Sequence, residues 1–267
     1  TLQASYTDFH YLRDKWKTVT EKDALIGVGM TGIGSGEILS YDLSQASKIV
    51  NETNRKYAKL IGINPASRTT TVKPSGTSSL VLGTSSGIHA WHNDYYIRRM
   101  RLGKNEALCD YLTKNHPELI EDDFFKPQNQ SIVSIPQKSP KNAILRNESA
   151  LDLLERTKKF NLEWVKGGHI KGSNTNNVSA TISIKEDEWD EVGHWMWKNR
   201  DTFNGLSVLP FDNGSYVQSP FEDITSYQYH KMKKLLTSID LTQVNELTDE
   251  TNLKESLACS SGGCEIF

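Results

Sequence analysis

Two cysteines close to the C-terminus are the residues of this chain best suited to redox chemistry. Cys259 and Cys264 are separated by Ser-Ser-Gly-Gly, and the chain of 267 residues contains only one other cysteine. Glycines allow the tight turn that brings two sulfur atoms together, so the pair can close a small disulfide ring. A zinc site would need two more ligands nearby, and no histidine follows residue 242. The spacing therefore favours a redox dithiol, with two unreactive surface thiols as the alternative.

The segment that carries this pair, residues 242–267, is polar and is predicted to be a loosely held, flexible tail. A flexible stretch of about 15 residues spans ~45–50 Å when fully extended. Such a tether could carry the two thiols between a buried site and an external donor. The remaining cysteine, Cys109, lies on a helical pattern and is predicted to belong to the core.

A second chemical feature is the serine-rich turn within residues 72–89, VKPSGTSSLVLGTSSGIH. Pro74 ends a β-branched strand, because proline cannot donate to a strand ladder. The next residues lead into a helix and offer free backbone N–H groups, short hydroxyls and a positive dipole end in one place. They are Ser75, Gly76, Thr77 and Ser78. The pattern predicts a phosphate site without a Walker lysine, and the alternative is a capped turn rich in serine.

The glycine-rich segment GVGMTG, residues 27–32, matches the dinucleotide fingerprint G-x-G-x-x-G, with Glu52 about 20 residues further on. A Rossmann helix must begin inside this motif so that its N-terminus meets the pyrophosphate. Here the helical pattern begins only near Ser40. The segment is therefore predicted to be a glycine-rich strand end, and an NAD-dependent enzyme is kept as an alternative.

Two further patterns favour structural roles. His89 and His92 form H-x-x-H, but no carboxylate or thiolate at ligand spacing completes a metal site, so no metal is predicted. The segment IRRMRLGK, residues 97–104, carries four cations that could face phosphates. A solvated edge is the more common outcome for such a run and is the prediction here.

The composition excludes several classes of protein. There are 31 Lys and Arg against 33 Asp and Glu, which disfavours a general nucleic-acid binder. No stretch approaches the roughly 18 apolar residues of a membrane span, and no signal peptide opens the chain. Three cysteines do not make a secreted disulfide framework. We expect a soluble, cytoplasmic protein with no membrane partner.

Apolar periodicity and turn residues predict the elements that must position these features. Helices are expected at residues 40–62, 149–164, 186–199 and 222–238. Ser149 and Asp152 form a rough capping box for the second of these helices. Extended segments are expected at residues 24–34, 69–73, 131–135, 177–184 and 206–210. Strands that alternate with helices predict an α/β protein with a largely parallel sheet.

Four segments together resemble the C-terminal part of ribonucleotide reductases, and the closest likeness is to the adenosylcobalamin-dependent, class II form. They are residues 64–101, 174–192 and 204–222 and the terminal CSSGGCEIF. The resemblance implies an α/β fold, the C-terminal part of a ten-stranded α/β barrel formed by residues 1–241, followed by the tail of residues 242–267.

The same resemblance implies roles for the residues that carry it. Ser75, Gly76, Thr77 and Ser78 would bind the phosphates of a ribonucleotide substrate. Cys259 and Cys264 would re-reduce an active-site disulfide after each turnover and would themselves be reduced by a thioredoxin-type protein. Adenosylcobalamin is the implied cofactor.

One departure from the family pattern limits what this chain is expected to do alone. The family carries the cysteine that becomes a thiyl radical in an N-x-C-x-E motif, and this sequence has no such motif. We therefore expect the radical cysteine in an N-terminal portion that this sequence lacks, and no catalysis without that portion. Whether the substrate is a diphosphate or a triphosphate is left open.

Two other functions remain as alternatives. The large subunit of a class I reductase would carry adjacent tyrosines close to its C-terminus, but the only such pair here, Tyr95 and Tyr96, lies far from Cys259. This position favours the cobalamin-dependent form. A stand-alone nucleotide- or phosphate-binding module with regulatory thiols would need no reductase partner.

Overall fold

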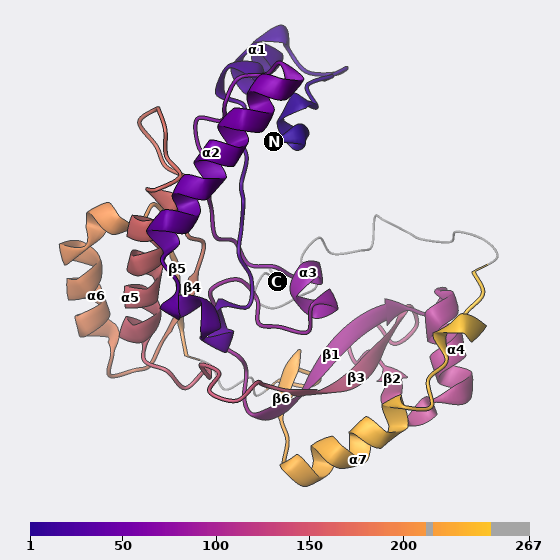
Figure 1. The fold of residues 1–267 in the computed structure, drawn as a ribbon. Coiled ribbons are helices and arrows are strands. Elements are labelled where there is room, and N and C mark those ends of the chain that lie inside the picture. The colour runs from indigo at the N-terminus through magenta and orange to yellow at the C-terminus, as the bar shows by residue number, and fades with distance from the viewer. Residues whose placement is uncertain (212–215, 247–267) are drawn as a thin grey trace. The chain divides into compact units, whose positions relative to one another are not determined.

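Two compact units make up the computed structural model, which describes residues 1–211 and 216–246. Unit 1 consists of residues 1–90 and 147–211, and unit 2 of residues 91–146 together with the described residues after 215. The elements of both units are labelled in Figure 1. The predicted tail cysteines, Cys259 and Cys264, lie outside the described residues.

Unit 1 contains most of the helices that the sequence predicts. Its regular elements are α1 (Asp14–Asp23), α2 (Leu43–Ile61), α3 (Thr77–Val81), α5 (Ala150–Phe160), a π-helical turn (Asn161–Val165), β4 (Thr181–Ile184), α6 (Trp189–Lys198) and β5 (Ser207–Pro210). Short 3-10 helices occur at Leu2–Ser5, Ile33–Ser35, Glu37–Ser40 and Arg200–Thr202.

The extended segments of unit 1 run parallel to one another, as the sequence predicts. β4 pairs with β5 in parallel, and α6 connects the two strands. Single parallel bridges join Val72 to Val178 and Val28 to Thr70. The bridges place four extended segments in the order 26–28, 69–72, 178–184 and 207–210, although only β4 and β5 form a regular ladder.

Local capping chemistry explains where the long helices of unit 1 begin and end. Asp42 accepts a hydrogen bond from the backbone N–H of Gln45 at 2.9 Å, and Gly62 ends α2 in the left-handed conformation at φ 77°. The predicted capping box of Ser149 and Asp152 is confirmed at the start of α5. The predicted helix over residues 149–164 continues past α5 only as the π-helical turn.

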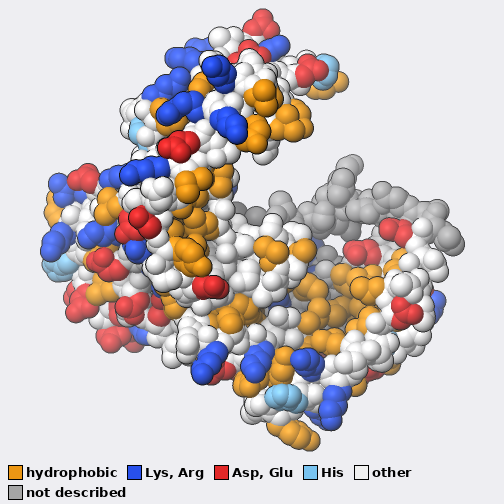
Figure 2. Space-filling view, in the orientation of Figure 1, with side chains coloured by type: hydrophobic (Ala, Val, Ile, Leu, Met, Phe, Trp, Pro, Cys, Tyr) orange, Lys and Arg blue, Asp and Glu red, His pale blue; other side chains and the backbone are white. Residues whose placement is uncertain are grey.

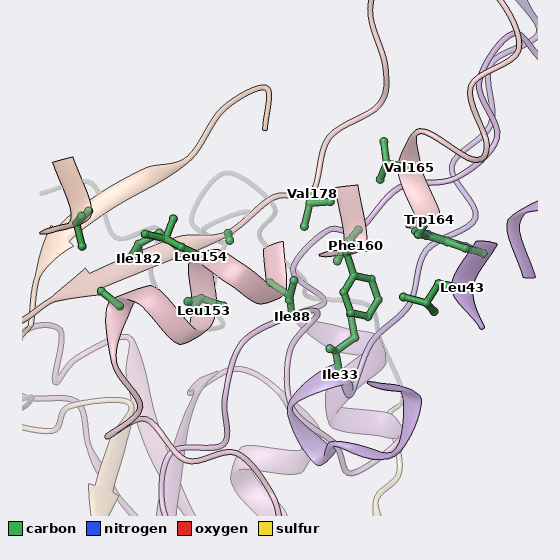
Figure 3. Packing of buried hydrophobic residues seen from close by; sticks show 14 of the residues in the cluster. Ile33, Leu43, Ile88, Leu153, Leu154, Phe160, Trp164, Val165, Val178 and Ile182 are labelled. Atoms are coloured by element: carbon green, nitrogen blue, oxygen red, sulfur yellow. The ribbon is translucent and has the colours of Figure 1, made fainter. Parts of the chain in front are cut away.

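The core of unit 1 lies where α5 packs against β4. Phe160 and Leu154 are fully buried there, and Figure 3 shows Phe160 pointing toward Ile33 beside Ile88. The same cluster takes in Leu43 from α2 and Val178 and Ile182 from the parallel segments. Segments far apart in the sequence therefore share one hydrophobic core.

Unit 2 is a four-stranded sheet with helices. Its elements are β1 (Tyr95–Gly103), α4 (Ala107–Asn115), a 3-10 helix (Pro117–Leu119), β2 (Ile120–Asp122), β3 (Gln130–Lys138), β6 (Phe221–Asp223), α7 (Ser226–Leu236) and a 3-10 helix (Leu241–Gln243). The strand order is β2-β3-β1-β6, and every neighbouring pair is antiparallel. Ile239 and Val244 pack on a small cluster that includes Tyr111 and Leu112 of α4.

The prediction of a largely parallel sheet is wrong for unit 2. Gly103 at the end of β1 pairs with Gln130 at the start of β3, so α4 and β2 lie within a hairpin-like connection and not within a crossover. The strand expected at residues 131–135 is therefore antiparallel. The helix expected from residue 222 begins at Ser226, because residues 221–223 pair with β1 and Thr225 caps the helix.

The prediction that residues 97–104 form a solvated edge is also wrong. All but the last of them belong to β1, which lies inside the sheet between β3 and β6. Arg99 forms an ion pair with Glu222, and Arg101 Nε lies 2.9 Å from the buried carboxylate of Asp123. Arg99 and Arg101 therefore form ion pairs with carboxylates of unit 2.

The packing of unit 1 predicts unequal costs for two leucine substitutions in one helical stretch. Leu154→Ala removes a fully buried side chain and is expected to lower the free energy of unfolding by about 2–5 kcal/mol. Leu162→Ala changes a side chain that is 44% exposed and is expected to cost about 1 kcal/mol or less. Urea unfolding followed by circular dichroism measures both, and equal costs would contradict the assignment of the core.

Candidate functional site

The predicted phosphate turn follows an extended segment that its neighbours hold firmly. The backbone N–H of Val72 donates to the Asn177 carbonyl at 3.1 Å, and the Val72 carbonyl accepts from the Ser179 N–H at 2.8 Å. Pro74 follows directly, and α3 begins at Thr77, which confirms the predicted turn that leads into a helix. The position of the turn is therefore set by the parallel segments of unit 1.

The hydrogen bonds inside the turn leave three adjacent donors unused. The Ser75 N–H donates to Ser86 Oγ at 2.9 Å, and the Ser79 N–H donates to Ser75 Oγ at 3.0 Å. Within the described part of the chain, the backbone N–H groups of Gly76, Thr77 and Ser78 have no hydrogen-bond partner. Thr77 and Ser78 are exposed to solvent. The turn thus presents consecutive N–H groups that an anion could accept from.

The glycine-rich segment supports the loop that follows the turn. Thr31 Oγ1 accepts from the Gly87 N–H at 2.9 Å and donates to the Ser85 carbonyl at 3.0 Å. The N–H groups of Gly32 and Ile33 donate to the carbonyls of Ser85 and Gly87 at 2.9 and 3.1 Å. The two backbones approach closely, so a Cβ atom at Gly32 would collide with the Thr84 side chain.

This role replaces the dinucleotide alternative for GVGMTG. Short 3-10 helices follow the motif, and α2 begins only at Leu43. The motif therefore lacks the helix N-terminus that a pyrophosphate would need.

His89 connects the same loop to β4. Its Nε2 accepts from the Thr181 N–H at 3.0 Å, which assigns the ring proton to Nδ1, 3.1 Å from the Ser86 carbonyl. Burial lowers the pKa of His89 below its ordinary value, so the ring is neutral near pH 7. The structural role predicted for this histidine is confirmed.

His92 belongs to unit 2 and is held by other groups. Its ring stacks on Phe221 with the ring centroids 5.1 Å apart, and its Nε2 lies 3.2 Å from Asp223 Oδ1. Burial is the largest cause that lowers the pKa of His92, to about 4, and Arg146 adds to this effect. Both histidines of the H-x-x-H pattern therefore have partners within the protein.

Cys109 is also structural, as predicted. It lies on α4 with 3% of its surface exposed, next to the buried residues Tyr111 and Leu112.

Unit 1 contains a cavity of about 400 Å³ that was not predicted from the sequence. Ile26, Gly27, Thr71, Lys73 and Asn176 line it on the side of the parallel segments. A signal was present in the sequence TTTVK, because strand alternation places Thr71 and Lys73 on one face and Thr70 and Val72 on the other. The structure shows Thr70 and Val72 buried, at 1% and 0% exposure.

The described residues contain neither a membrane-spanning helix nor a cluster of metal-ligating side chains. Within residues 1–211 and 216–246, no helix is both long and apolar enough to cross a membrane. The same part of the chain contains no group of three or more His, Cys, Asp or Glu residues placed to hold a metal ion.

Comparison with known proteins gives consistent matches. No family model matches the chain. A Lactobacillus acidophilus protein named adenosylcobalamin-dependent ribonucleoside-triphosphate reductase is 26% identical over 96% of this chain and 38% of its own length. The Euglena gracilis protein of the same name is 25% identical over 93% of this chain and 35% of its own length. A Dictyostelium discoideum protein with that name, qualified as probable, is 27% identical over 82% of the chain.

A solved structure agrees with these relatives. The crystal structure of a B12-dependent, class II ribonucleotide reductase matches this fold with a TM-score of 0.68 at 23% identity. The match covers 85% of this chain and 35% of that structure. The chain therefore spans well under half the length of the curated relatives and of the solved structure that it matches.

The loop beside the turn predicts different effects for two glycine substitutions. Gly83 and Gly87 have nearly the same φ, +59° and +55°, but a Cβ at Gly83 meets open space, whereas one at Gly87 would lie 2.6 Å from the Lys73 carbonyl oxygen. Gly83→Ala should cost only the left-handed strain of about 1–2 kcal/mol. Gly87→Ala should cost clearly more and should shift the amide NMR signals of residues 73–79. Equal destabilisation by both variants would show that the close approach is not structurally important.

Proposed function

We propose that this chain, a homologue of adenosylcobalamin-dependent ribonucleoside-triphosphate reductases, forms the C-terminal portion of such a reductase. It binds the phosphates of a ribonucleotide at the turn of residues 75–78 and returns electrons to the active site through the dithiol of Cys259 and Cys264. The observation that supports this most is the set of three backbone N–H groups, at Gly76, Thr77 and Ser78, that have no partner among the described residues.

The turn suits phosphate better than a capping role. A capped turn would use its donors internally, whereas here Ser75 and Ser79 bond to each other and no described residue accepts from the three N–H groups between them. Backbone N–H groups in series form a concave anion site without a lysine. Their position is fixed before any ligand arrives, because Ser86 holds Ser75 and the parallel segments hold Val72. A preorganised site avoids part of the cost of ordering on binding.

The rest of the reductase must supply what this sequence does not contain. The sequence has no N-x-C-x-E motif, so the cysteine that carries the thiyl radical belongs to the remainder of the length that the relatives have. That radical activates the ribose, and the 2'-hydroxyl is replaced by hydrogen to give the deoxyribonucleotide.

Open surfaces of unit 1 support an assembly with further residues. All four residues of β5 are exposed, and within the described chain this strand pairs only with β4. An exposed strand edge is a ready template for another strand. Large apolar side chains such as Trp16 and Leu60 are also exposed, and Figure 2 shows hydrophobic patches between charged residues over the N-terminal elements. We propose that further strands continue this sheet into the ten-stranded barrel.

Adenosylcobalamin is the proposed source of the radical, by analogy with the names of the relatives. The described residues do not fit this cofactor by themselves. The cavity of about 400 Å³ is too small for a corrin ring with its nucleotide loop. We therefore place most of the cofactor site outside the described residues and derive no step through it.

The tail dithiol completes the electron balance of the reaction. Reduction of one ribonucleotide oxidises two active-site thiols to a disulfide. The thiolate of one tail cysteine attacks that disulfide, the second tail thiol resolves the mixed disulfide, and two electrons and two protons pass to the active site. A thioredoxin-type protein then reduces the tail disulfide by the same exchange. Thiols on a tether suit this role because they must reach two different partners.

Ser78→Asp tests the phosphate turn without removing a structural group. A carboxylate in the first turn of a helix is compatible with folding, but it would repel a bound phosphate. We expect ribonucleoside triphosphate binding, measured by isothermal titration calorimetry, to weaken by about tenfold or more. Ser44→Asp places the same charge in the first turn of α2 and should leave the affinity unchanged. Equal affinities for the wild type and Ser78→Asp would refute the phosphate role.

Cys264→Ser tests the tail in the assembled reductase. Turnover driven by thioredoxin should be abolished, because the tail can no longer form a disulfide. Turnover driven by a small dithiol should persist, since such a reductant reaches the active site directly. Ser261→Ala, within the same tail, is the control and should support both reactions. Loss of both activities in Cys264→Ser would contradict a shuttle role.

A further inference from the structure

The cavity of unit 1 has an unbalanced charge. Its lining residues come from the N-terminal segment and α1 on one side, including Gln3, Tyr6 and Thr20, and from the parallel segments on the other. Among the described residues, Lys73 is the only lysine or arginine that lines the cavity, and none of the lining residues is Asp or Glu. In the described part of the chain, the Lys73 ammonium has no hydrogen-bond or ion-pair partner. An uncompensated cation in a concave site attracts an anion.

The backbone around Lys73 is fixed, although its side chain has no partner in the part of the chain that the structure describes. Thr71 Oγ1 donates to the Asn177 carbonyl at 2.9 Å, and the Thr71 carbonyl accepts from Trp164 Nε1 at 3.0 Å. Val72 is fully buried and Pro74 restricts the next residue, so alternation directs Lys73 away from the core and toward the cavity. The ammonium is therefore carried on a rigid base at the edge of a preformed space.

The other polar groups of the cavity suit an anionic ligand. The Asn176 side-chain amide donates to the Ile26 and Thr70 carbonyls at 3.2 and 3.1 Å, which holds the wall of the cavity in place. A volume of about 400 Å³ lies at the lower end of the range of small-molecule sites, roughly 300–1,000 Å³. A phosphate group with part of its nucleotide fits this space.

We propose that Lys73 binds the outer phosphate of the substrate within this cavity and so favours nucleoside triphosphates over monophosphates. The inference rests on the proposed function, because the inner phosphate is assigned to the adjacent turn of residues 75–78. Lys73 immediately precedes Pro74 and that turn, so one short segment supplies an exposed cation and then three N–H donors whose backbone is held in place. On this assignment a ligand with a single phosphate occupies the turn and leaves Lys73 without a phosphate to bind.

The test compares CTP and CMP binding to the full 267-residue chain by isothermal titration calorimetry at constant ionic strength. Wild type should bind CTP more tightly than CMP. Lys73→Gln should weaken CTP binding by about tenfold or more, the expected loss of a charge-assisted contact, and should leave CMP binding nearly unchanged. Lys73→Arg should retain the preference for CTP. Lys48→Gln removes an equal charge from an exposed position on α2 and is the control.

The outcomes separate this inference from the proposed function. If Lys73→Gln keeps the wild-type ratio of CTP to CMP affinity, or if Lys48→Gln lowers it equally, the role of Lys73 is wrong and the phosphate turn stands. If the wild-type chain binds neither nucleotide, both proposals fail. Urea midpoints for each variant show whether a loss of affinity arises from unfolding, and Lys73→Gln should keep the wild-type midpoint because residue 73 is exposed.

Discussion

The backbone contact between the glycine-rich segment and the loop of residues 84–89 is the constraint on which the candidate site depends. Gly32 and Ile33 donate to this loop, and Thr31 bonds to it through both its donor and its acceptor. The loop in turn holds the phosphate turn through Ser86 and reaches β4 through His89. Buried backbone polar groups must find partners, and these partners are available only if the two backbones come close together. Small residues are therefore required on both sides.

The sequence predicted the elements of unit 1 well because local chemistry determines them. The ends of α2 follow from Asp42 and Gly62, and the start of α5 follows from its capping box. Such signals lie within a few residues of the element that they specify. The buried, branched residues of the parallel segments are equally visible in the sequence, and so is the serine-rich turn after Pro74.

The antiparallel sheet and the cavity could not be predicted in the same way, because distant residues define them. The direction of β3 depends on the pairing of Gly103 with Gln130 across 27 residues (130 − 103), and several connections would satisfy the same local pattern. The cavity forms because Tyr6, Lys73 and Asn176, which are far apart in the sequence, line the same space. No local sequence pattern predicts that these residues come together. The assignment of the tail cysteines remains a prediction, because it concerns residues outside the described part of the chain.

Whether a positively charged side chain is available to a ligand depends on its ion-pair partners more than on how many cations lie near it in the sequence. Residues 97–104 contain four positively charged side chains, which could suggest a phosphate site. In the structure, however, Arg99 and Arg101 form ion pairs with carboxylates. Burial alone would raise the pKa of Asp123, but hydrogen bonds from the Lys126 N–H and from Arg101 lower it, so this buried pair stays charged. Lys73 does not belong to a run of cations, but none of the described residues that line its cavity is a carboxylate.

The extended segment of residues 69–73 has one face that packs into the core and another that lines the cavity. Thr70 bonds to the Trp164 carbonyl at 2.7 Å and Val72 fills the core, while Thr71 and Lys73 face the cavity. A shift of one residue in register would exchange the two faces and would bury the lysine. Trp164 opposes such a shift from both sides, since its carbonyl accepts from Thr70 and its indole donates to the Thr71 carbonyl. Because the register of five residues decides whether a cation faces the cavity or the core, the proposed phosphate contact depends on Trp164 and on the backbone bonds to Asn177 and Ser179 as much as on Lys73 itself.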